Sequence, residues 1–229
     1  NGEKKFLDLL FKYYKSKGEN NLVIFDVGAN MGKYSELILA NGGLHNIDVL
    51  LHLFEPQKTC FDELMKNFSD LSNVIINNFG LSDSETEEEI FYDERGSGLA
   101  SLYKRDLSHY SMEFSSSEII QIKRLDSYIE NKKIHHIHLL KLDVEGHEIN
   151  VLRGLGSYLD KSFLDFIQFE YGGANIDSRT FLRDFFSMLV PKGFKIAKIM
   201  PKGLEILKYK SYYEDFQYKN FVAISEMLI

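Results

Sequence analysis

The sequence has one cysteine in 229 residues. Cys60 alone cannot form an intrachain disulfide, and a metal site built from several cysteines is excluded as well. Disulfides are rare in reducing compartments, so the lone cysteine favours a cytoplasmic location. The sequence also lacks an uninterrupted apolar run of about 18 residues, the length that marks a membrane-spanning helix. We therefore expect no membrane span.

A surplus of positive charge is missing too. The chain has 27 Lys and Arg against 34 Asp and Glu, a formal net charge of −7. Nucleic-acid binding depends on clustered basic side chains, so a nucleic-acid partner is not expected. The short basic stretch "KKIHH" is more typical of a solvated loop.

The N-terminal stretch "NGEKKFLDLLFKYYKSKG" lacks the apolar core and the small-residue cleavage site of a signal peptide. Its apolar residues follow helical spacing instead, which predicts an amphipathic helix within residues 1–20. The chain does not begin with methionine, as would be the case for a piece of a longer protein.

Apolar runs of strand length alternate with helical stretches along most of the chain. Strands are expected near residues 22–27, 49–55, 73–79, 136–144, 163–171, 194–200 and 220–226. Helices are expected over residues 33–40, 59–68, 148–159 and 178–190, the last with Asp177 or Ser178 as its N-cap. This alternation predicts an α/β fold with a parallel sheet covered by helices on both faces, in a single domain over residues 1–229.

Residues 84–126 interrupt the alternation. The stretches "TEEEIFYDE" and "SEIIQIKRL" have the composition of two strands, and a Gly- and Ser-containing segment lies between them. We expect a hairpin or flap inserted into the sheet.

Residues 23–39, "VIFDVGANMGKYSELIL", read as an apolar strand, a glycine-containing turn and the start of a helix. In open α/β sheets, a ligand binds outside the carboxyl ends of the strands, at such a corner. The dinucleotide fingerprint G-x-G-x-x-G fails here, because Asn30 and Lys33 occupy its second and third glycine places. A P-loop fails as well, since no G-K-[ST] follows. An NAD-dependent dehydrogenase is therefore disfavoured.

Two carboxylates flank this corner. Asp26, at the end of the first strand, would repel a pyrophosphate but would favour a ligand that carries a cationic amine. Glu55 ends the next strand, where a carboxylate accepts hydrogen bonds from ribose hydroxyls in nucleotide-binding α/β folds. An amine, a ribose and no pyrophosphate indicate S-adenosylmethionine as the cofactor.

Further motifs occur in an order found in a known family: "FDVGANMGKYS", "HLFEPQ", "NFGLSDSE", "RLDSYI", "LLKLDVEGHEINVLRGL" and "FIQFEYG". Over residues 22–173 the sequence resembles the FkbM-type S-adenosylmethionine-dependent methyltransferases, most specifically in "KLDVEGHE" joined to "VLRG". The resemblance implies a Rossmann-like class I methyltransferase fold with a seven-stranded sheet whose last strand is antiparallel. It also implies methyl transfer, usually to a hydroxyl oxygen of a sugar or polyketide-like acceptor.

The resemblance implies cofactor contacts at three places. Asp26, Gly28, Asn30 and Gly32 would line the methionine end, with Tyr34 and Ser35 in the adjoining helix. Glu55 would hold the ribose, and Pro56 would form the turn against it. Gly80, Leu81 and Ser82 would lie beside the adenine.

A base is needed near the methyl group, because an alcohol keeps its proton at neutral pH. The stretch "LDVEGHEI" offers Asp143, Glu145 and His147 as candidates. Asp143 and Glu145 share one face of a strand by the period of two, which predicts Asp143 closest to the methyl group. Glu145 or His147 would then lie toward the acceptor, and the ordinary pKa of a histidine suits a base. Glu148 is interpreted as a first-turn carboxylate of the next helix.

Acceptor contacts are predicted for Ser101 in the flap and for Glu170 and Tyr171 at the end of the fifth strand. No metal is expected, because "HHIH" lacks the companions of a zinc site. A divalent ion held by Asp143, Glu145 and Glu170 stays open as an alternative.

Two rival functions remain open on the sequence. One is a non-catalytic nucleoside-binding domain of the same fold. The other is methylation at nitrogen or on RNA, and the acidic balance of the chain disfavours RNA. The leading hypothesis is O-methylation of a small-molecule or carbohydrate acceptor.

Overall fold

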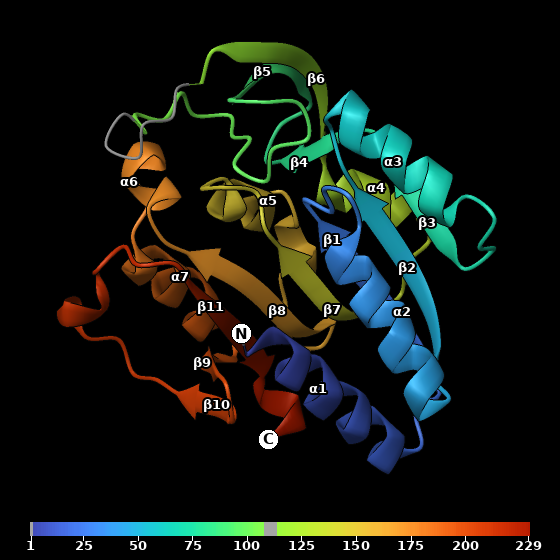
Figure 1. Ribbon diagram of the computed structural model, residues 1–229. Coiled ribbons are helices and arrows are strands. Elements are labelled where there is room, and N and C mark those ends of the chain that lie inside the picture. The colour runs from blue at the N-terminus through green and yellow to red at the C-terminus, as the bar shows by residue number, and fades with distance from the viewer. Residues whose placement is uncertain (1, 108–113) are drawn as a thin grey trace.

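The computed structural model describes residues 2–107 and 114–229, and its centre is an eight-stranded sheet (Figure 1). Strands β1, β2, β3, β7 and β8 run parallel, and β11 is antiparallel to β8 and β9. In spatial order the strands are β10 (Gly203–Ile206), β9 (Phe194–Met200), β11 (Lys219–Ser225), β8 (Leu164–Tyr171), β7 (Ile137–Leu142), β1 (Asn21–Val27), β2 (Asp48–Phe54) and β3 (Val74–Asn77). The predicted α/β fold with an antiparallel last strand is confirmed.

The sheet has one strand more than the seven expected. Strand β10 follows β9 through a turn at Pro201 and Lys202 and pairs with it antiparallel at the edge of the sheet. Its residues Glu205 and Ile206 are both exposed, so the strand lacks the apolar continuity that marks the others. This is why the sequence pattern around it reads as a polar excursion.

Helices cover both faces of the sheet, and alternate strand residues point to each face. On one face, α1 (Glu3–Lys17), α2 (Lys33–His45) and α3 (Lys58–Phe68) pack against a core that includes Ile24 and Leu53. On the other, α4 (Leu125–Lys132), α5 (Glu148–Arg153) and α7 (Leu182–Leu189) pack against residues such as Phe25 and Phe54. The helix expected within residues 1–20 is α1.

The helix expected over residues 178–190 is the shorter α7, which begins only at Leu182, and a separate short helix precedes it. The short α6 (Ala174–Ser178) ends at Arg179, whose φ of 55° lies in the left-handed region. Helix α7 begins after Phe181, and the backbone N–H of Phe181 donates to the Asp184 carboxylate at 2.8 Å. Asp177 and Ser178 are therefore not its N-cap, because the chain turns before the second helix begins.

The expected hairpin forms a second sheet beside the first. Strands β5 (Thr86–Tyr92) and β6 (Ser116–Arg124) pair antiparallel, and β6 also pairs in parallel with β4 (Gly80–Ser82). Ile90, Ile120 and Ile122 form a small apolar cluster between this sheet and the body. Figure 1 shows the three strands above the carboxyl ends of β1 and β2. Of the loop between β5 and β6, residues 108–113 lie outside the described residues.

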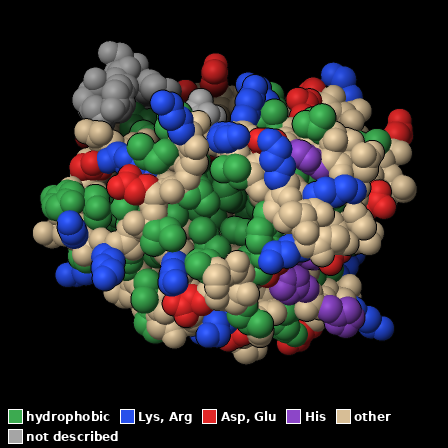
Figure 2. Space-filling view, turned by 90° about the horizontal axis from the view of Figure 1, so that it is seen from below, with side chains coloured by type: hydrophobic (Ala, Val, Ile, Leu, Met, Phe, Trp, Pro, Cys, Tyr) green, Lys and Arg blue, Asp and Glu red, His purple; other side chains and the backbone are tan. Residues whose placement is uncertain are grey.

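The face opposite the hairpin carries apolar surface. Figure 2 shows hydrophobic side chains gathered around the middle of the face seen from below, with Lys and Arg around them. Exposed apolar residues of the chain include Ile206, Met227 and Ile229. Within residues 2–107 and 114–229, no helix has the length and apolarity needed to cross a membrane.

Candidate active site

A cavity of about 520 Å³ opens at the carboxyl ends of β1, β2 and β7, beneath the hairpin sheet. Its size falls in the range of about 300–1,000 Å³ typical of small-molecule and cofactor sites. The segments that line it include residues 27–31 after β1, residues 54–57 after β2, residues 96–102 of the flap and residues 143–147 after β7. The loops that the sequence singled out therefore meet around one space.

Two glycines shape the loop after β1, for different reasons. Gly28 has a φ of 78°, and a Cβ there would lie 1.9 Å from the carbonyl oxygen of Asp143. Gly32 has a φ of 84° and lies outside the cavity lining, where a Cβ would meet the ring of Phe68 at 2.4 Å. Gly28 thus lets β1 approach β7 at the cavity, whereas Gly32 lets α2 pack against α3.

Glu55, for which the sequence predicts a contact with a ribose, lies directly after β2. Its side chain is buried but lines the cavity. One carboxylate oxygen accepts the backbone N–H of Asn30 at 2.8 Å, and the other accepts that of Gln57 at 2.9 Å. Burial raises the pKa of Glu55 to about 7, although both hydrogen bonds oppose the shift. A carboxylate has about four acceptor positions, so two remain for ligand hydroxyls.

The end of the cavity beside Glu55 is mostly apolar. Gly80 and Leu81, for which the sequence predicts contact with the adenine, line it together with Pro56. The hairpin sheet contributes a wall that the sequence did not reveal, made by Ile90, Ile120 and Ile122. Ser82 lies outside the lining and pairs with His147 instead, its Oγ 2.8 Å from Nε2 of that ring.

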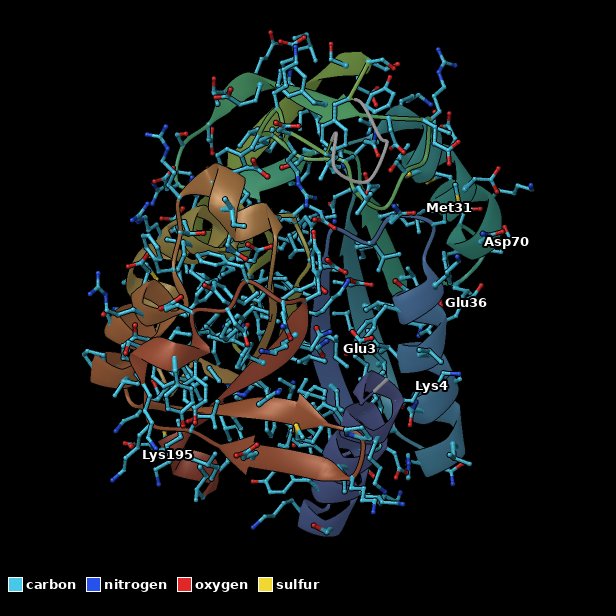
Figure 3. The ribbon with its side chains drawn as sticks, turned by 60° about the vertical axis from the view of Figure 1, so that its left-hand side comes forward. Glu3, Lys4, Met31, Glu36, Asp70 and Lys195 are labelled. Carbon is cyan, nitrogen blue, oxygen red and sulfur yellow. The ribbon has the colours of Figure 1, made fainter. Side chains whose placement is uncertain are left out.

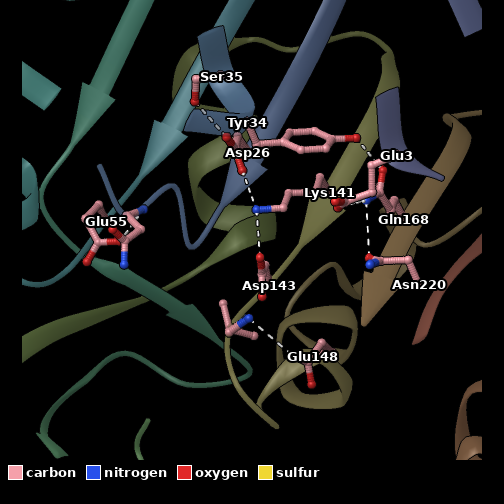
Figure 4. A network of polar contacts seen from close by, with 12 residues as sticks. Glu3, Asp26, Tyr34, Ser35, Glu55, Lys141, Asp143, Glu148, Gln168 and Asn220 are labelled. Carbon is pink, nitrogen blue, oxygen red and sulfur yellow. Dashed lines mark hydrogen bonds and ion pairs between the residues drawn. The ribbon is translucent and has the colours of Figure 1, made fainter. Parts of the chain in front are cut away.

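Asp26 does not reach the cavity, and its predicted direct contact with a cationic ligand is revised. The side chain is fully buried. Its Oδ2 accepts a hydrogen bond from Ser35 Oγ at 2.7 Å, and its Oδ1 lies 3.0 Å from Nζ of Lys141 (Figure 4). Asp26 and Lys141 are opposite each other on β1 and β7, so the register of the sheet covers the carboxylate with an ammonium group.

Lys141 is one of the residues that the sequence analysis missed. It is buried, and its Nζ also lies 3.2 Å from the Asp143 carboxylate and 5.0 Å from the centroid of the Tyr34 ring. Burial lowers the pKa of Lys141, but the charges of Asp143 and Asp26 outweigh it and leave the pKa raised. The signal was present in "LLKLDV", because a lysine inside a buried strand requires a carboxylate partner.

Three carboxylates meet where β7 and β8 end. One oxygen each of Asp143, Glu145 and Glu170 lie within 4.8 Å of one another, a spacing that could hold a divalent ion. Burial, followed by the charge of Asp143, raises the pKa of both Glu145 and Glu170 to about 8. Two cations already offset this charge, since Lys141 pairs with Asp143 and a buried arginine pairs with Glu145.

That arginine is Arg105, which comes from the flap. Its Nη1 donates to Oε2 of Glu145 at 2.8 Å, its Nη2 donates to the Tyr218 hydroxyl at 2.6 Å, and its Nε lies 3.4 Å from the Asp177 carboxylate. Ser101 Oγ donates to the backbone carbonyl of Glu145 at 2.8 Å. Glu145 itself has a φ of 48°, so the flap holds a strained residue at both its backbone and its side chain.

His147 lines the cavity, but both of its ring nitrogens have partners. Nε2 lies 2.8 Å from Ser82 Oγ, and Nδ1 lies 3.1 Å from the Tyr103 hydroxyl. Burial lowers the pKa of His147 to about 4, so the ring stays neutral at neutral pH. Glu148 has the structural role expected of it, because its Oε1 accepts the backbone N–H groups of Val144 and Gly146.

The predicted acceptor residues are placed differently from one another. Ser101 lines the cavity, but its hydroxyl is engaged with Glu145. Glu170 lies beside Asp143 in the carboxylate group and outside the cavity lining. Tyr171 is fully buried on the opposite face of β8, and its hydroxyl donates to Glu214. Adjacent residues of a strand face opposite ways, so Glu170 and Tyr171 cannot both face the site.

The comparisons with known proteins agree on the class of protein. A family model described as the methyltransferase FkbM domain matches residues 26–201. The hexuronic acid methyltransferase AglP of Haloferax volcanii is 26% identical over 161 residues, which cover 69% of this chain and 58% of that protein. The crystal structure of methyltransferase FkbM from Methylobacillus flagellatus KT has a TM-score of 0.56 at 12% identity, covering 90% of this chain and 44% of that chain.

The chain thus spans about half the length of these two relatives. The structural likeness, at its low identity, shows the shared fold. The family match covers more than half of the chain, and it includes the loop after β1, Glu55, Lys141 and the carboxylates that follow β7 and β8. The chain therefore belongs to the FkbM methyltransferase family.

Proposed function

We propose that this chain is a methyltransferase domain that transfers the methyl group of S-adenosylmethionine to a hydroxyl of a sugar, glycoconjugate or other small acceptor. One observation carries the proposal: a single cavity joins the Gly28 turn, a buried Glu55 with acceptor positions to spare, and the Asp143 carboxylate. The residues present fit a nucleoside that carries a cationic side chain. We also propose a cytoplasmic location, because a lone, buried, unpaired cysteine such as Cys60 is typical of proteins from reducing compartments.

In this proposal each part of the cofactor has its own residues. Glu55 would accept the ribose hydroxyls, and Gly80 and Leu81, with the isoleucines of the hairpin sheet, would enclose the adenine. The turn at Gly28 and Asn30 would lie against the methionine part. When bound, the cofactor supplies a methyl group on a sulfonium leaving group, so the protein needs mainly to align the acceptor and exclude water.

Asp143 is our choice for the group that takes the hydroxyl proton. Its side chain lines the cavity and is 43% exposed, whereas Glu145 is buried against Arg105. His147 would have to give up Ser82 or Tyr103 to act as the base. Lys141, with its Nζ 3.2 Å from the Asp143 carboxylate, holds that side chain in place at the wall of the cavity.

The proposed acceptor class is supported by family and by charge. The curated relative is named for a hexuronic acid, which is a sugar. The Asp143 carboxylate, which lines the cavity, can accept hydrogen bonds from sugar hydroxyls. The net charge of −7 disfavours RNA.

Two measurements test the proposal in sequence. Calorimetry with S-adenosylmethionine and S-adenosylhomocysteine should show binding of both, and a folded protein that binds neither would refute it. A tritiated-methyl assay should then label at least one member of a panel of methyl glycosides, uronic acids and glycolipids. If only amines or RNA were labelled, the proposed hydroxyl acceptor would be wrong. If the cofactor bound but no acceptor were labelled, a non-catalytic domain would be favoured.

A further inference from the structure

The cavity extends beyond the loop after β1 and reaches the first turn of helix α1. Glu3 and Lys4 line this end, together with Lys33, Tyr34 and Leu37 of α2. In Figure 3, Glu3 lies toward the middle of the molecule at the start of α1, whereas Glu36 of α2 lies at its outer edge. The N-terminal helix therefore borders the same space as the Gly28 turn, although the sequence motifs begin only after it.

Glu3 is held in position by a buried amide. Nε2 of Gln168, a fully buried residue of β8, donates to Oε1 of Glu3 at 3.1 Å. The Tyr34 hydroxyl donates to Oε1 of the same glutamine, which fixes the orientation of the amide (Figure 4). Asn220 of β11 lies 3.4 Å from Nε2 as well. Glu3 is thus oriented by Gln168, whose amide is fixed in turn by Tyr34 and Asn220, as a ligand-binding side chain is when its neighbours restrict its rotamers.

This end of the cavity carries both signs of charge, Glu3 as the acidic side chain and Lys4 and Lys33 as basic ones, which suits a ligand group that is itself both cationic and anionic. Asp26, which the sequence placed here as the anion, has no exposed surface and is covered by Lys141. Asp143 lines the cavity but shares the same lysine. Glu3 therefore supplies the negative charge that Asp26 cannot present to the cavity.

We propose that Glu3 binds the α-ammonium group of the methionine part of the cofactor, so that helix α1 forms part of the cofactor site. This inference rests on the proposed function, because it takes the ligand to be an aminoacyl nucleoside. The methionine part would lie between the Gly28 turn and the first turn of α1. Lys4 and Lys33, on the same rim, would face its carboxylate.

The test compares two nucleosides that differ in the amino-acid part. S-adenosylhomocysteine carries the α-ammonium and the carboxylate, and 5′-methylthioadenosine lacks both. Glu3→Gln keeps the shape of the side chain and its ability to accept from Gln168, but removes the charge. We expect Glu3→Gln to weaken the binding of S-adenosylhomocysteine about tenfold, or about 1.4 kcal/mol. The affinity for 5′-methylthioadenosine should change less than twofold.

Glu36→Gln is the matched control. Glu36 is also an acidic first-turn residue, so both variants remove one charge that favours a helix N-terminus, but Glu36 is exposed and lies outside the cavity lining. Both ligands should bind this variant as they bind the wild type. If the wild type binds neither nucleoside, the proposed function itself fails. If it binds and Glu3→Gln binds S-adenosylhomocysteine equally well, or loses both ligands to the same extent, the role of Glu3 is refuted while the proposed function stands.

Discussion

The two ends of strands β7 and β8 carry similar groups of titratable side chains with different surroundings. At the carboxyl end, Asp143, Glu145 and Glu170 gather beside a cavity. At the amino end, His136 and Asp165 pair at 2.9 Å, and the Tyr14 hydroxyl of α1 covers the same Asp165 oxygen at 2.6 Å.

Both groups have the spacing of a metal site, but in the amino-end group neighbouring protein atoms already occupy ligand atoms. His138, its third member, accepts the backbone N–H of Val23 on Nδ1 at 2.9 Å, which occupies a lone pair of the ring. Tyr14 packs edge-on against that ring. A cluster of polar side chains thus indicates a binding site when it lies beside a cavity. It indicates a structural contact when a helix packs on it and bonds to it, as α1 does through Tyr14.

The largest effect is expected on stability, at the fully buried Asp26 beside the cavity. Asp26→Asn removes one carboxylate from Lys141 and should lower the free energy of unfolding by about 3 kcal/mol, because it leaves a buried ammonium partly unpaired. Urea denaturation measures the loss. A change below about 0.5 kcal/mol would mean that Asp143 alone satisfies the lysine.

The second prediction compares the turnover of variants at the two ends of β7 and β8. Asp143→Asn should lower turnover at least about a hundredfold, because a positioned base contributes about 10²–10⁴-fold. Binding of S-adenosylhomocysteine should change less than about threefold. Asp165→Asn, at the amino end, should lower stability but leave turnover of the folded protein unchanged. Equal loss of turnover in both variants would remove the distinction between the ends.

The third prediction concerns the cofactor alone. Glu55→Ala should weaken the binding of S-adenosylhomocysteine at least about tenfold, or about 1.4 kcal/mol, because it removes the carboxylate proposed to accept hydrogen bonds from the ribose. Calorimetry measures the dissociation constant. The affinity of Asp26→Asn should fall less than that of Glu55→Ala, since Asp26 lies behind Lys141. The reverse order would return Asp26 to the role that the sequence suggested.

The smallest effect is a dependence of stability on pH. The hydrogen bond to Asp165 raises the pKa of His136 above its ordinary value, even though burial opposes it. A raised pKa means that the folded state favours the protonated ring. Its contribution to stability is therefore complete below the unfolded pKa of about 6.5 and is lost as the pH rises through the folded pKa.

His136→Gln should flatten this part of the curve. Groups at the carboxyl end also lower stability as the pH rises, because burial raises the pKa of Glu55 to about 7 and that of Glu145 to about 8. Only the difference between wild type and variant, measured by thermal unfolding from pH 6 upward, reports the amino end. Parallel curves would show that the His136 pair contributes nothing.

Much of the fold and the location of the site could be predicted from sequence. The turn at Gly28 and the strand-end Glu55 depend on short-range patterns with a fixed place in an open α/β sheet, and both line the cavity. The period of two along β8 would also have separated Glu170 from Tyr171, because neighbouring strand residues face opposite sides.

Other features depend on contacts between distant segments. Asp26 is covered by Lys141 because β1 and β7 are neighbours in one register, which no local pattern encodes. Arg105 comes from an irregular stretch without periodicity, and its partners lie 40 or more residues away. The edge strand β10 has too little buried surface to leave a pattern of its own.

The position of Arg105 constrains how this protein can be recombined with its relatives. One guanidinium group connects the flap with Glu145 after β7, with Asp177 of α6 and with Tyr218 just before β11. A chimera that takes its flap from a homologue without this arginine would leave Glu145 buried without its cation. A hybrid that is to keep these contacts therefore has to exchange the flap together with the loop after β7, helix α6 and the segment before β11.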